Sequence, residues 1–449
     1  METTELMVEG DVNFSEERRK WDQQIIDPRT RQILDDDARY FLHQSMSSPC
    51  LEVLDSCKGS GIKTLSGNYL LDFHGNNVHQ LGYGNDDVVS QIIEQMQLLP
   101  FSPRRYTNQP AVELAKKLAE MLPGDVNRSL FAPGGTSVIG MALKLARVVT
   151  KKHKIVSLWD SFHGASLDAI SAGGELVFKK YMGPIMPGVI CIPPPTTYWG
   201  IFGDTEADQL NYADYLEYVI EKEGDIGAFL AETVRNTDVQ IPTRAYWKRV
   251  REICTKHKVL LILDEIPIAL GRTGKMFAFE NYEIEPDILC LGKGLGGGII
   301  PFAAMVTRDR FNVADDISLG HYTHEKSPLG SVAALATINY IEKENLLQKV
   351  VDDGLWMKEE LNKLKEQFQI IGDVRGLGLL WGIELVKDRK TKKKAKKKAE
   401  QIMYECMHHG LSFKVSQGNV LQLSPALTIN REDLQRAISI LAAALAKYS

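Results

Sequence analysis

The chain has 449 residues, of which 25% are charged and 44% hydrophobic, and its formal net charge at pH 7 is −5. A chain of this length can bury a large core, and this composition is typical of a soluble globular protein with two lobes. The small negative charge gives no reason to expect nucleic-acid binding, and no apolar run approaches the length of a membrane span. Six scattered cysteines without Cys-x-x-Cys spacing favour neither disulfides nor a zinc site.

The N-terminal region predicts a polar arm rather than a targeting segment. Residues 1–21 are polar and acidic without an apolar core, so we expect no signal peptide and a cytoplasmic protein. Residues 5–36 have some helical character. Arms of this kind often pack on a partner subunit, and a frayed surface segment is an equal alternative.

A polar cluster follows a predicted strand at Tyr69–Phe73. It runs from His74 to Gln80 and is dense in Asn and His beside glycine. We expect it to form one wall of a polar pocket, with Asn77 and His79 as substrate-binding candidates. The alternative is a loop whose Asn side chains satisfy their own backbone.

Two adjacent arginines, Arg104 and Arg105, follow a proline-containing turn. The planar guanidinium group suits carboxylate, phosphate and phosphonate groups, so both are candidates for binding an anionic substrate. Because solvated surface arginines are commoner, the pair is weak evidence by itself. An amphipathic helix is predicted next, from Ala111 to Leu122.

A phosphate-binding turn is predicted where a strand ending near Phe131 leads through Gly134-Gly135-Thr136-Ser137 into a helix over 138–149. Glycines at a helix N-terminus expose backbone N–H groups, and the helix dipole adds partial positive charge. The alternative is a plain helix cap by Thr136 or Ser137.

An aromatic side chain, Phe162, follows the predicted strand Ile155–Trp159 and precedes His163. An aromatic ring at a strand end can stack on a flat cofactor, although Phe162 as core filling is the competing interpretation. We expect His163 to be a hydrogen-bonding residue rather than a metal ligand, because no second ligand is spaced for it.

Strands alternate with helices from about residue 125 to 310, which indicates an α/β fold with a doubly wound parallel sheet. One of these strands ends in Glu232, and a smaller α+β lobe begins near residue 371. We expect an N-terminal arm and part of a small domain over 1–75, a large domain over 76–330, and a C-terminal small domain over 331–449.

The two central strands end in an acid and an amine. Val259–Leu263 leads into Asp264, and Ile288–Leu291 leads into Lys293 between glycines. Ligands bind outside the carboxyl ends of parallel strands, so both groups should reach one cleft. They suit a Schiff base to pyridoxal phosphate (PLP) and an acid partner for its pyridinium nitrogen, whereas a simple Asp–Lys ion pair is an equal alternative.

Several separated motifs in this order resemble the class III aminotransferase group of fold-type I PLP enzymes. The motifs include Phe162-His163-Gly164, Asp264-Glu265, Gly271-Arg272-Thr273-Gly274, Gly-Lys-Gly at Lys293, and Val374-Arg375-Gly376. The resemblance covers nearly the whole chain. It implies the fold-type I PLP-dependent transferase fold, with a small domain built from both termini, and pyridoxal 5'-phosphate as the cofactor.

The resemblance also implies roles for individual residues. Lys293 would form the Schiff base, Asp264 would pair with the pyridinium nitrogen, and Phe162 would stack on the ring. Thr323 would reach the phosphate of the neighbouring subunit, so the active unit would be a homodimer that shares its active sites. The remaining residues of the implied cofactor site are Gly135, Thr136, His163 and Glu232.

Departures from the family pattern bear on the substrate. Members that handle α-amino acids usually carry an arginine before a Pro-Pro-Leu stretch, and Gln422 stands at that place here. An uncharged amide cannot replace the guanidinium fork, so a conventional α-amino-acid transaminase is disfavoured. Ile266-Pro267 replaces the usual Val-Gln, and Ser137 stands where an acidic residue is common.

The combination of Pro103–Asn108, Ala132–Ser137, Asp264–Pro267 and Gly320–Lys326 looks like a lyase branch of this family that breaks down phosphonates. This likeness implies an ammonia-lyase that converts (R)-1-hydroxy-2-aminoethylphosphonate to phosphonoacetaldehyde and ammonia. The main alternative is an ω-aminotransferase that moves an amino group from a terminal amine to an α-keto acid. A non-catalytic regulator, a decarboxylase and a racemase are weaker alternatives.

Overall fold

The computed structural model describes residues 15–44 and 50–449. Residues 1–14 lie outside the described residues. They contain the first part of the predicted arm and the first part of the segment in which we expect no signal peptide. The chain divides into two compact units. The large unit comprises residues 86–236 and 240–347, and the small unit comprises the chain up to Asn85 together with 237–239 and 348–449.

A seven-stranded sheet forms the centre of the large unit, in the order β4-β10-β9-β8-β7-β5-β6. Neighbours from β6 to β9 are parallel, and β10 is antiparallel to both β4 and β9. The predicted mostly parallel, doubly wound sheet is therefore confirmed. The strands are β4 (Val126–Ala132), β5 (Lys154–Leu158), β6 (Val189–Ile192), β7 (Ile226–Glu232), β8 (Leu260–Asp264), β9 (Ile288–Leu291) and β10 (Ala303–Arg308).

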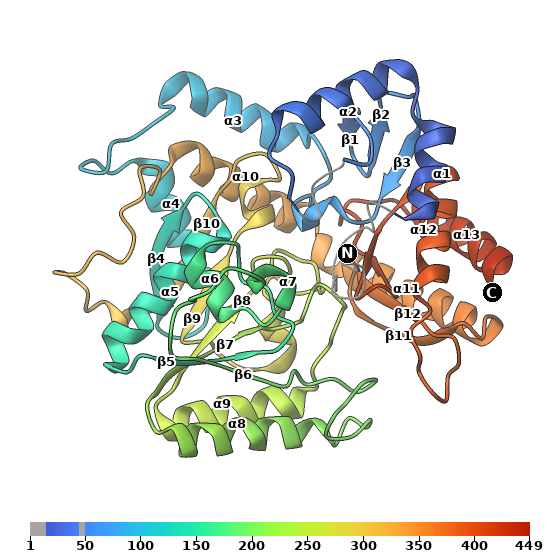
Figure 1. The fold of residues 1–449 in the computed structure, drawn as a ribbon. Helices are drawn as coiled ribbons and strands as arrows, with labels where there is room; N and C mark the ends of the chain where they lie inside the picture. Colours follow the sequence, from blue (N-terminus) through green and yellow to red (C-terminus); the bar gives the residue numbers. More distant parts are fainter. Residues whose placement is uncertain (1–14, 45–49) are drawn as a thin grey trace. The chain divides into compact units, whose positions relative to one another are not determined.

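Helices lie on both faces of this sheet (Figure 1). Helices α8 and α9 lie together below the sheet in that view, and α5 lies on the other face. The helical segments are α3 (Asp86–Leu98), α4 (Gln109–Met121), α5 (Gly135–Thr150), α6 (Leu167–Ala172), α7 (Leu176–Lys179), α8 (Gln209–Glu223), α9 (Arg244–His257), η2 (Ala278–Tyr282), η3 (Lys293–Gly296), η4 (Asp309–Phe311) and α10 (Pro328–Lys343).

Helix α5 is buried against the sheet of the large unit. Ile139 and Leu143 of α5 pack with the alternate strand residues Leu230 and Ile262 in one buried cluster. Each such side chain stabilises the fold by about 1.5–3 kcal/mol when fully buried. Helix α5 begins at Gly135 rather than at the predicted residue 138, because the glycine pair that suggested a loop forms the helix cap and first turn.

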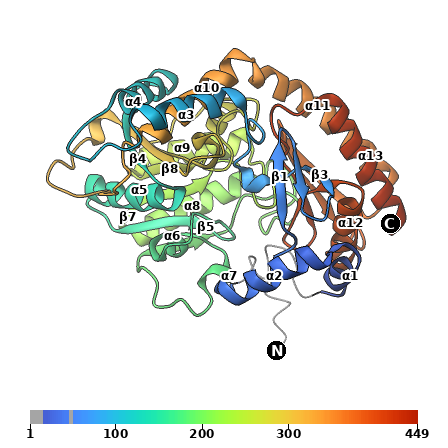
Figure 2. The ribbon, with the colours of Figure 1, turned by 90° about the horizontal axis from the view of Figure 1, so that it is seen from above.

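The small unit contains two four-stranded sheets, ordered β1-β2-β3-β13 and β11-β12-β15-β14. Figure 2 shows α12 and α13 side by side along the second part of this unit. None of the described helices is long and apolar enough to cross a membrane. The elements are α1 (Glu16–Ile25), α2 (Pro28–Tyr40), β1 (Leu54–Lys58), β2 (Gly61–Thr64), β3 (Tyr69–Asp72), η1 (Gly75–Asn77), α11 (Leu346–Gln367, which begins in the large unit), β11 (Ile371–Leu377), β12 (Leu380–Leu385), α12 (Lys396–His408), β13 (Leu411–Ser412), β14 (Lys414–Ser416), β15 (Val420–Leu423) and α13 (Arg431–Tyr448).

Candidate active site

The carboxyl ends of β7, β8 and β9 bring polar residues to one edge of the sheet. Glu232 on β7 pairs in register with Asp264 on β8, and Asp264 pairs with Cys290 on β9. Lys293 begins η3, directly after β9 and Gly292. The parallel register therefore places the predicted acid and amine on adjacent strand ends, where α/β sheets bind ligands.

Asp264 is held by a histidine from the neighbouring segment of chain. His163 Nδ1 lies 2.8 Å from Asp264 Oδ2, and the two side chains are 0% and 3% exposed. Because an ionised carboxylate only accepts hydrogen bonds, Nδ1 carries the proton and donates it. The second oxygen, Oδ1, accepts from the backbone N–H of Ile266 at 3.0 Å. The carboxylate is thus fixed in direction, as expected for His163 acting as a hydrogen-bonding residue.

Glu232 is a second buried carboxyl group at this edge. Its oxygens accept from the backbone N–H of Phe162 at 3.4 Å and of Asn236 at 3.1 Å. Burial raises the pKa of Glu232; the proximity of His163 opposes this rise, and the negative charge of Asp264 adds to it. The site therefore combines one carboxyl group with a raised pKa and one hydrogen-bonded to histidine.

The N-terminus of α5 is packed closely against the same strand ends. Gly134 is its N-cap, and no side chain caps the helix. A Cβ added to Gly135 would lie 2.8 Å from Ile266 Cδ1, and one added to Gly164 would lie 2.3 Å from Thr136 Oγ1. The predicted glycine turn, the Phe-His-Gly segment and the residues after Asp264 are therefore in mutual contact.

Lys293 occupies a backbone conformation that is uncommon for lysine. Its φ is +47°, in the left-handed region, and it precedes Gly294 in a short 3-10 helix. Such conformations carry a small energetic cost in residues other than glycine and cluster at functional sites. Phe162, the predicted stacking residue, is half-buried, with its ring 4.4 Å from that of Phe178.

The remaining predicted site residues lie on exposed loops of the large unit or in the small unit. Arg104, Arg105 and Thr323 are exposed. Asn77 and His79 are buried in the small unit, where His79 Nε2 lies 3.2 Å from the carbonyl oxygen of Asp72. The substrate roles of Arg104, Arg105, Asn77 and His79, and the role of Thr323 at the phosphate of the neighbouring subunit, stay predictions.

Glu265 is a polar residue of this region to which we assigned no role from the sequence. Its carboxyl group is fully buried and accepts from Thr233 Oγ1 at 2.8 Å, from the N–H of Ala278 at 2.6 Å and from the N–H of Phe279 at 2.8 Å. Burial raises the pKa of Glu265 to about 7. It holds the loop that follows Asp264, and its position directly after a buried strand, next to Asp264, was the only signal in the sequence.

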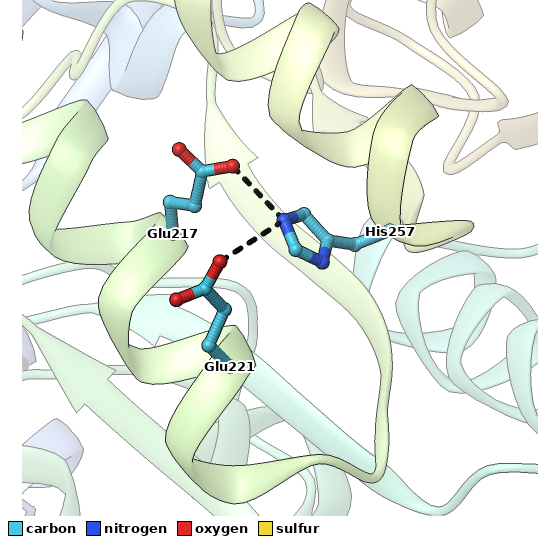
Figure 3. A group of neighbouring side chains, drawn as sticks. All are labelled: Glu217, Glu221 and His257. Carbon is cyan, nitrogen blue, oxygen red and sulfur yellow. Dashed lines mark hydrogen bonds and ion pairs between the residues drawn. The ribbon is translucent and has the colours of Figure 1, made fainter.

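A group of potential metal ligands elsewhere in the large unit is better explained as an ion-pair network. Glu217, Glu221 and His257 point toward one another, with ligand atoms within 4.8 Å (Figure 3). Hydrogen bonds from Lys256 and His257 lower the pKa of Glu217 to about 2, and Arg249 Nη2 lies 2.7 Å from its other oxygen. A metal ion would have to displace these cations, so the group joins α8 to α9 and gives no support for a metal site.

Comparisons with known proteins agree with this geometry. A family model described as aminotransferase class-III matches residues 43–445. The (R)-1-hydroxy-2-aminoethylphosphonate ammonia-lyase of Vibrio splendidus (strain 12B01) is 56% identical over 462 aligned positions, covering 100% of this chain and 96% of that protein. The leucine/methionine racemase of Thermococcus litoralis is 35% identical, covering 82% of this chain and 84% of that protein.

Solved structures give the same fold. An (S)-enantioselective omega-transaminase from Thermomicrobium roseum matches with a TM-score of 0.87 and 28% identity, covering 93% of this chain and 98% of that chain. A PLP-bound amine transaminase from an uncultivated Pseudomonas species matches with a TM-score of 0.85 and 29% identity, covering 91% and 99%. The expected fold-type I architecture is confirmed.

Proposed function

Because the chain belongs to the class-III aminotransferase family, we propose that it is a PLP-dependent ammonia-lyase that acts on (R)-1-hydroxy-2-aminoethylphosphonate. The products are phosphonoacetaldehyde and ammonia, which together contain all the atoms of the substrate. The observation that carries the proposal is the 56% identity to the Vibrio splendidus lyase over the whole chain. Gln422 on β15, in place of the usual arginine, fits a substrate without an α-carboxylate.

The cofactor is pyridoxal 5'-phosphate, and the residues of the large unit fit it. The uncapped N-terminus of α5, at Gly135 and Thr136, offers N–H groups and the positive end of a helix dipole to the phosphate. The fixed carboxylate of Asp264 fits a protonated ring nitrogen, and the Lys293 amine fits the aldehyde. Phe162 would lie against the ring.

The side chains of this site can divide the proton transfers between them. When bound, PLP supplies an electron sink for a carbanion beside the substrate amine. The Lys293 amine removes a proton from the aminomethyl carbon, while Asp264, oriented by His163, keeps the ring nitrogen protonated. The hydroxyl on the neighbouring carbon then leaves as water, and hydrolysis of the enamine product gives the aldehyde and ammonia. His79 and Tyr106 are among the candidates for protonating that hydroxyl.

The active form is a homodimer in this proposal. Large apolar side chains are exposed on α3 and the loop after it, among them Leu98 at 81% and Tyr106 at 66%, and apolar patches of this kind support association with a second copy. The exposed Thr323 would reach the phosphate site of the partner subunit. The free cysteines fit a reducing, cytoplasmic location, and the substrate fits a role in phosphonate catabolism.

One assay tests the proposed reaction against the ω-aminotransferase alternative, which the solved transaminase structures favour. The purified holoenzyme is incubated with the hydroxy-aminophosphonate in the absence of any keto acid. The lyase releases ammonia and aldehyde over many turnovers, whereas a transferase releases no ammonia and stops after about one equivalent of aldehyde per site. Aldehyde formation that depends on an added α-keto acid and is accompanied by no ammonia would refute the lyase proposal.

A further inference from the structure

Two loops of the large unit carry exposed positive charge. Loop 101–108 contains Arg104 and Arg105, and loop 320–327 contains Lys326 and two exposed histidines. The only acidic residue of the two loops is Glu325. Neither arginine has an ion-pair partner among residues 15–44 and 50–449. A doubly charged phosphonate needs donors of this kind, and bidentate arginine contacts suit it well.

The two loops are fastened to each other, and together we call them the basic loop pair. Asn108 Nδ2 donates to the carbonyl oxygen of Lys326 at 2.9 Å. Asn108 Oδ1 accepts from the N–H of Ala111 at 3.0 Å and so caps α4. The rings of Phe101 and His324 meet edge to face, with centroids 5.3 Å apart. One buried amide therefore fixes the arginine loop both to its helix and to loop 320–327.

The basic loop pair stands away from the cofactor site of its own chain. Asp264 and Lys293 follow β8 and β9 in the middle of the sheet. In both views the connection between α3 and α4, and the connection before α10, project from the side of the large unit that carries β4 (Figures 1 and 2). This placement disfavours binding of a substrate that is held at Lys293 of the same chain.

Apolar side chains are exposed within the arginine loop and on the helix that precedes it. Met96 and Leu98 on α3 are 53% and 81% exposed, and Tyr106 within the loop is 66% exposed. Exposed apolar surface beside unpaired charge is typical of an interface that is covered in the assembly. A second copy of this chain would cover the apolar part and would offer an anionic substrate to the arginines.

We propose that the basic loop pair of one subunit binds the phosphonate group of the substrate held in the active site of its partner. Arg104 and Arg105 bind the anion, and Asn108 is a positioning residue that sets the two loops relative to each other. The proposal rests on the proposed lyase function, since it assigns the phosphonate end of that site. Neither active site is then complete in a single chain.

Mixed dimers test this assignment. Chains carrying Lys293→Ala are co-expressed with chains carrying both Arg104→Ala and Arg105→Ala, each with its own affinity tag, and the doubly tagged dimer is purified. If the arginines act across the interface, one of the two sites in this dimer is intact, and ammonia release should be about half that of the wild type. If they act within their own chain, no site is intact, and activity at the level of the parent variants would overturn the proposal. A wild-type enzyme without lyase activity would instead refute the proposed function.

Steady-state kinetics supply a second test. Arg105→Ala should raise KM for the phosphonate by about 10- to 100-fold through loss of a charged hydrogen bond, whereas Arg244→Ala, a surface control on α9, should not change it. Cofactor absorbance confirms that each variant is folded. An unchanged KM in both arginine variants would place the phosphonate elsewhere.

A substitution of Asn108 can separate its contact with loop 320–327 from its role as the N-cap of α4. Asn108→Asp keeps the oxygen that caps α4 and loses the donor to Lys326, so it should raise KM with kcat changed less than about twofold. Asn430→Asp, at the cap of α13, is the matched control and should leave KM unchanged. An Asn108→Asp enzyme with wild-type KM would show that the contact between the loops is not used.

Discussion

Glu265 should make the protein less stable as the pH rises, and replacing it with glutamine should remove that dependence. Burial raises the pKa of Glu265 from its usual 4.5 to about 7. Between these values the folded chain keeps a proton that the unfolded chain has released. Stability therefore falls as pH rises through this window and is lowest above pH 7.

The size of this loss of stability follows from the shift in the pKa of Glu265. The difference between these two pKa values corresponds to roughly 3 kcal/mol of stability at high pH, and most of this loss develops between pH 5 and pH 8. Glu265→Gln removes this pH-dependent loss of stability, but it turns an amide NH₂ toward the N–H of Ala278 or Phe279. An unsatisfied buried donor costs about 1–3 kcal/mol. The variant should thus be less stable than the wild type at pH 5 and at least as stable as the wild type at pH 8, where the wild type has lost roughly 3 kcal/mol.

Equilibrium denaturation of the two proteins, measured in parallel from pH 5 to pH 8, checks this expectation, because other titrating groups cancel in the difference. Thr233→Val removes one donor to the carboxylate and should move the pH-dependent loss of stability to higher pH. A wild-type-to-variant difference that stays constant across this range, or that grows with pH, would refute the reasoning.

Three further expectations concern the active site and the ion-pair network between α8 and α9. Lys293→Ala should abolish turnover and the absorbance of the bound cofactor, and a variant that keeps both would exclude its proposed role. His163→Ala removes the 2.8 Å hydrogen bond to Asp264 and should weaken cofactor binding, measured by absorbance titration, by about 1.5–3 kcal/mol. His163→Asn keeps a donor near the position of Nδ1 and should recover part of this loss. Equal losses in the two variants would argue against a role for the hydrogen bond. Dialysis against a chelator should leave ammonia release unchanged, since Glu217 is already paired with cations, and activity restored by added zinc would contradict this.

The strand ends of the active site were predictable because they depend on local patterns. The unbroken apolar run Val259–Leu263 indicates a strand buried on both faces, and β8 spans Leu260–Asp264. Since neighbouring parallel strands end at the same edge, the sequence places Asp264 and Lys293 together without knowledge of any contact. The hydrogen-bonding role of His163 followed from the lack of a second metal ligand nearby.

Contacts between segments far apart in the chain were not predictable in this way. The hydrogen bond between Asn108 and Lys326 joins residues 218 positions apart and leaves no periodic signal in the sequence. The same is true of the hydrogen bonds to Glu265 and of the packing of Ile266 against Gly135. Such contacts depend on how the strands are ordered in space, and single-sequence patterns report only on neighbours along the chain.

The small unit joins residues from both ends of the chain. Strand β13 adds to the edge of β3, with Leu411 opposite Leu71 in parallel register, and the N–H of Phe73 donates to the carbonyl oxygen of Ser412 at 2.8 Å. During translation, the outer edge of β3 must therefore wait until more than 300 later residues have left the ribosome. An open strand edge is a template for aggregation, so this edge of β3 is unprotected in the nascent chain until β13 has been synthesised.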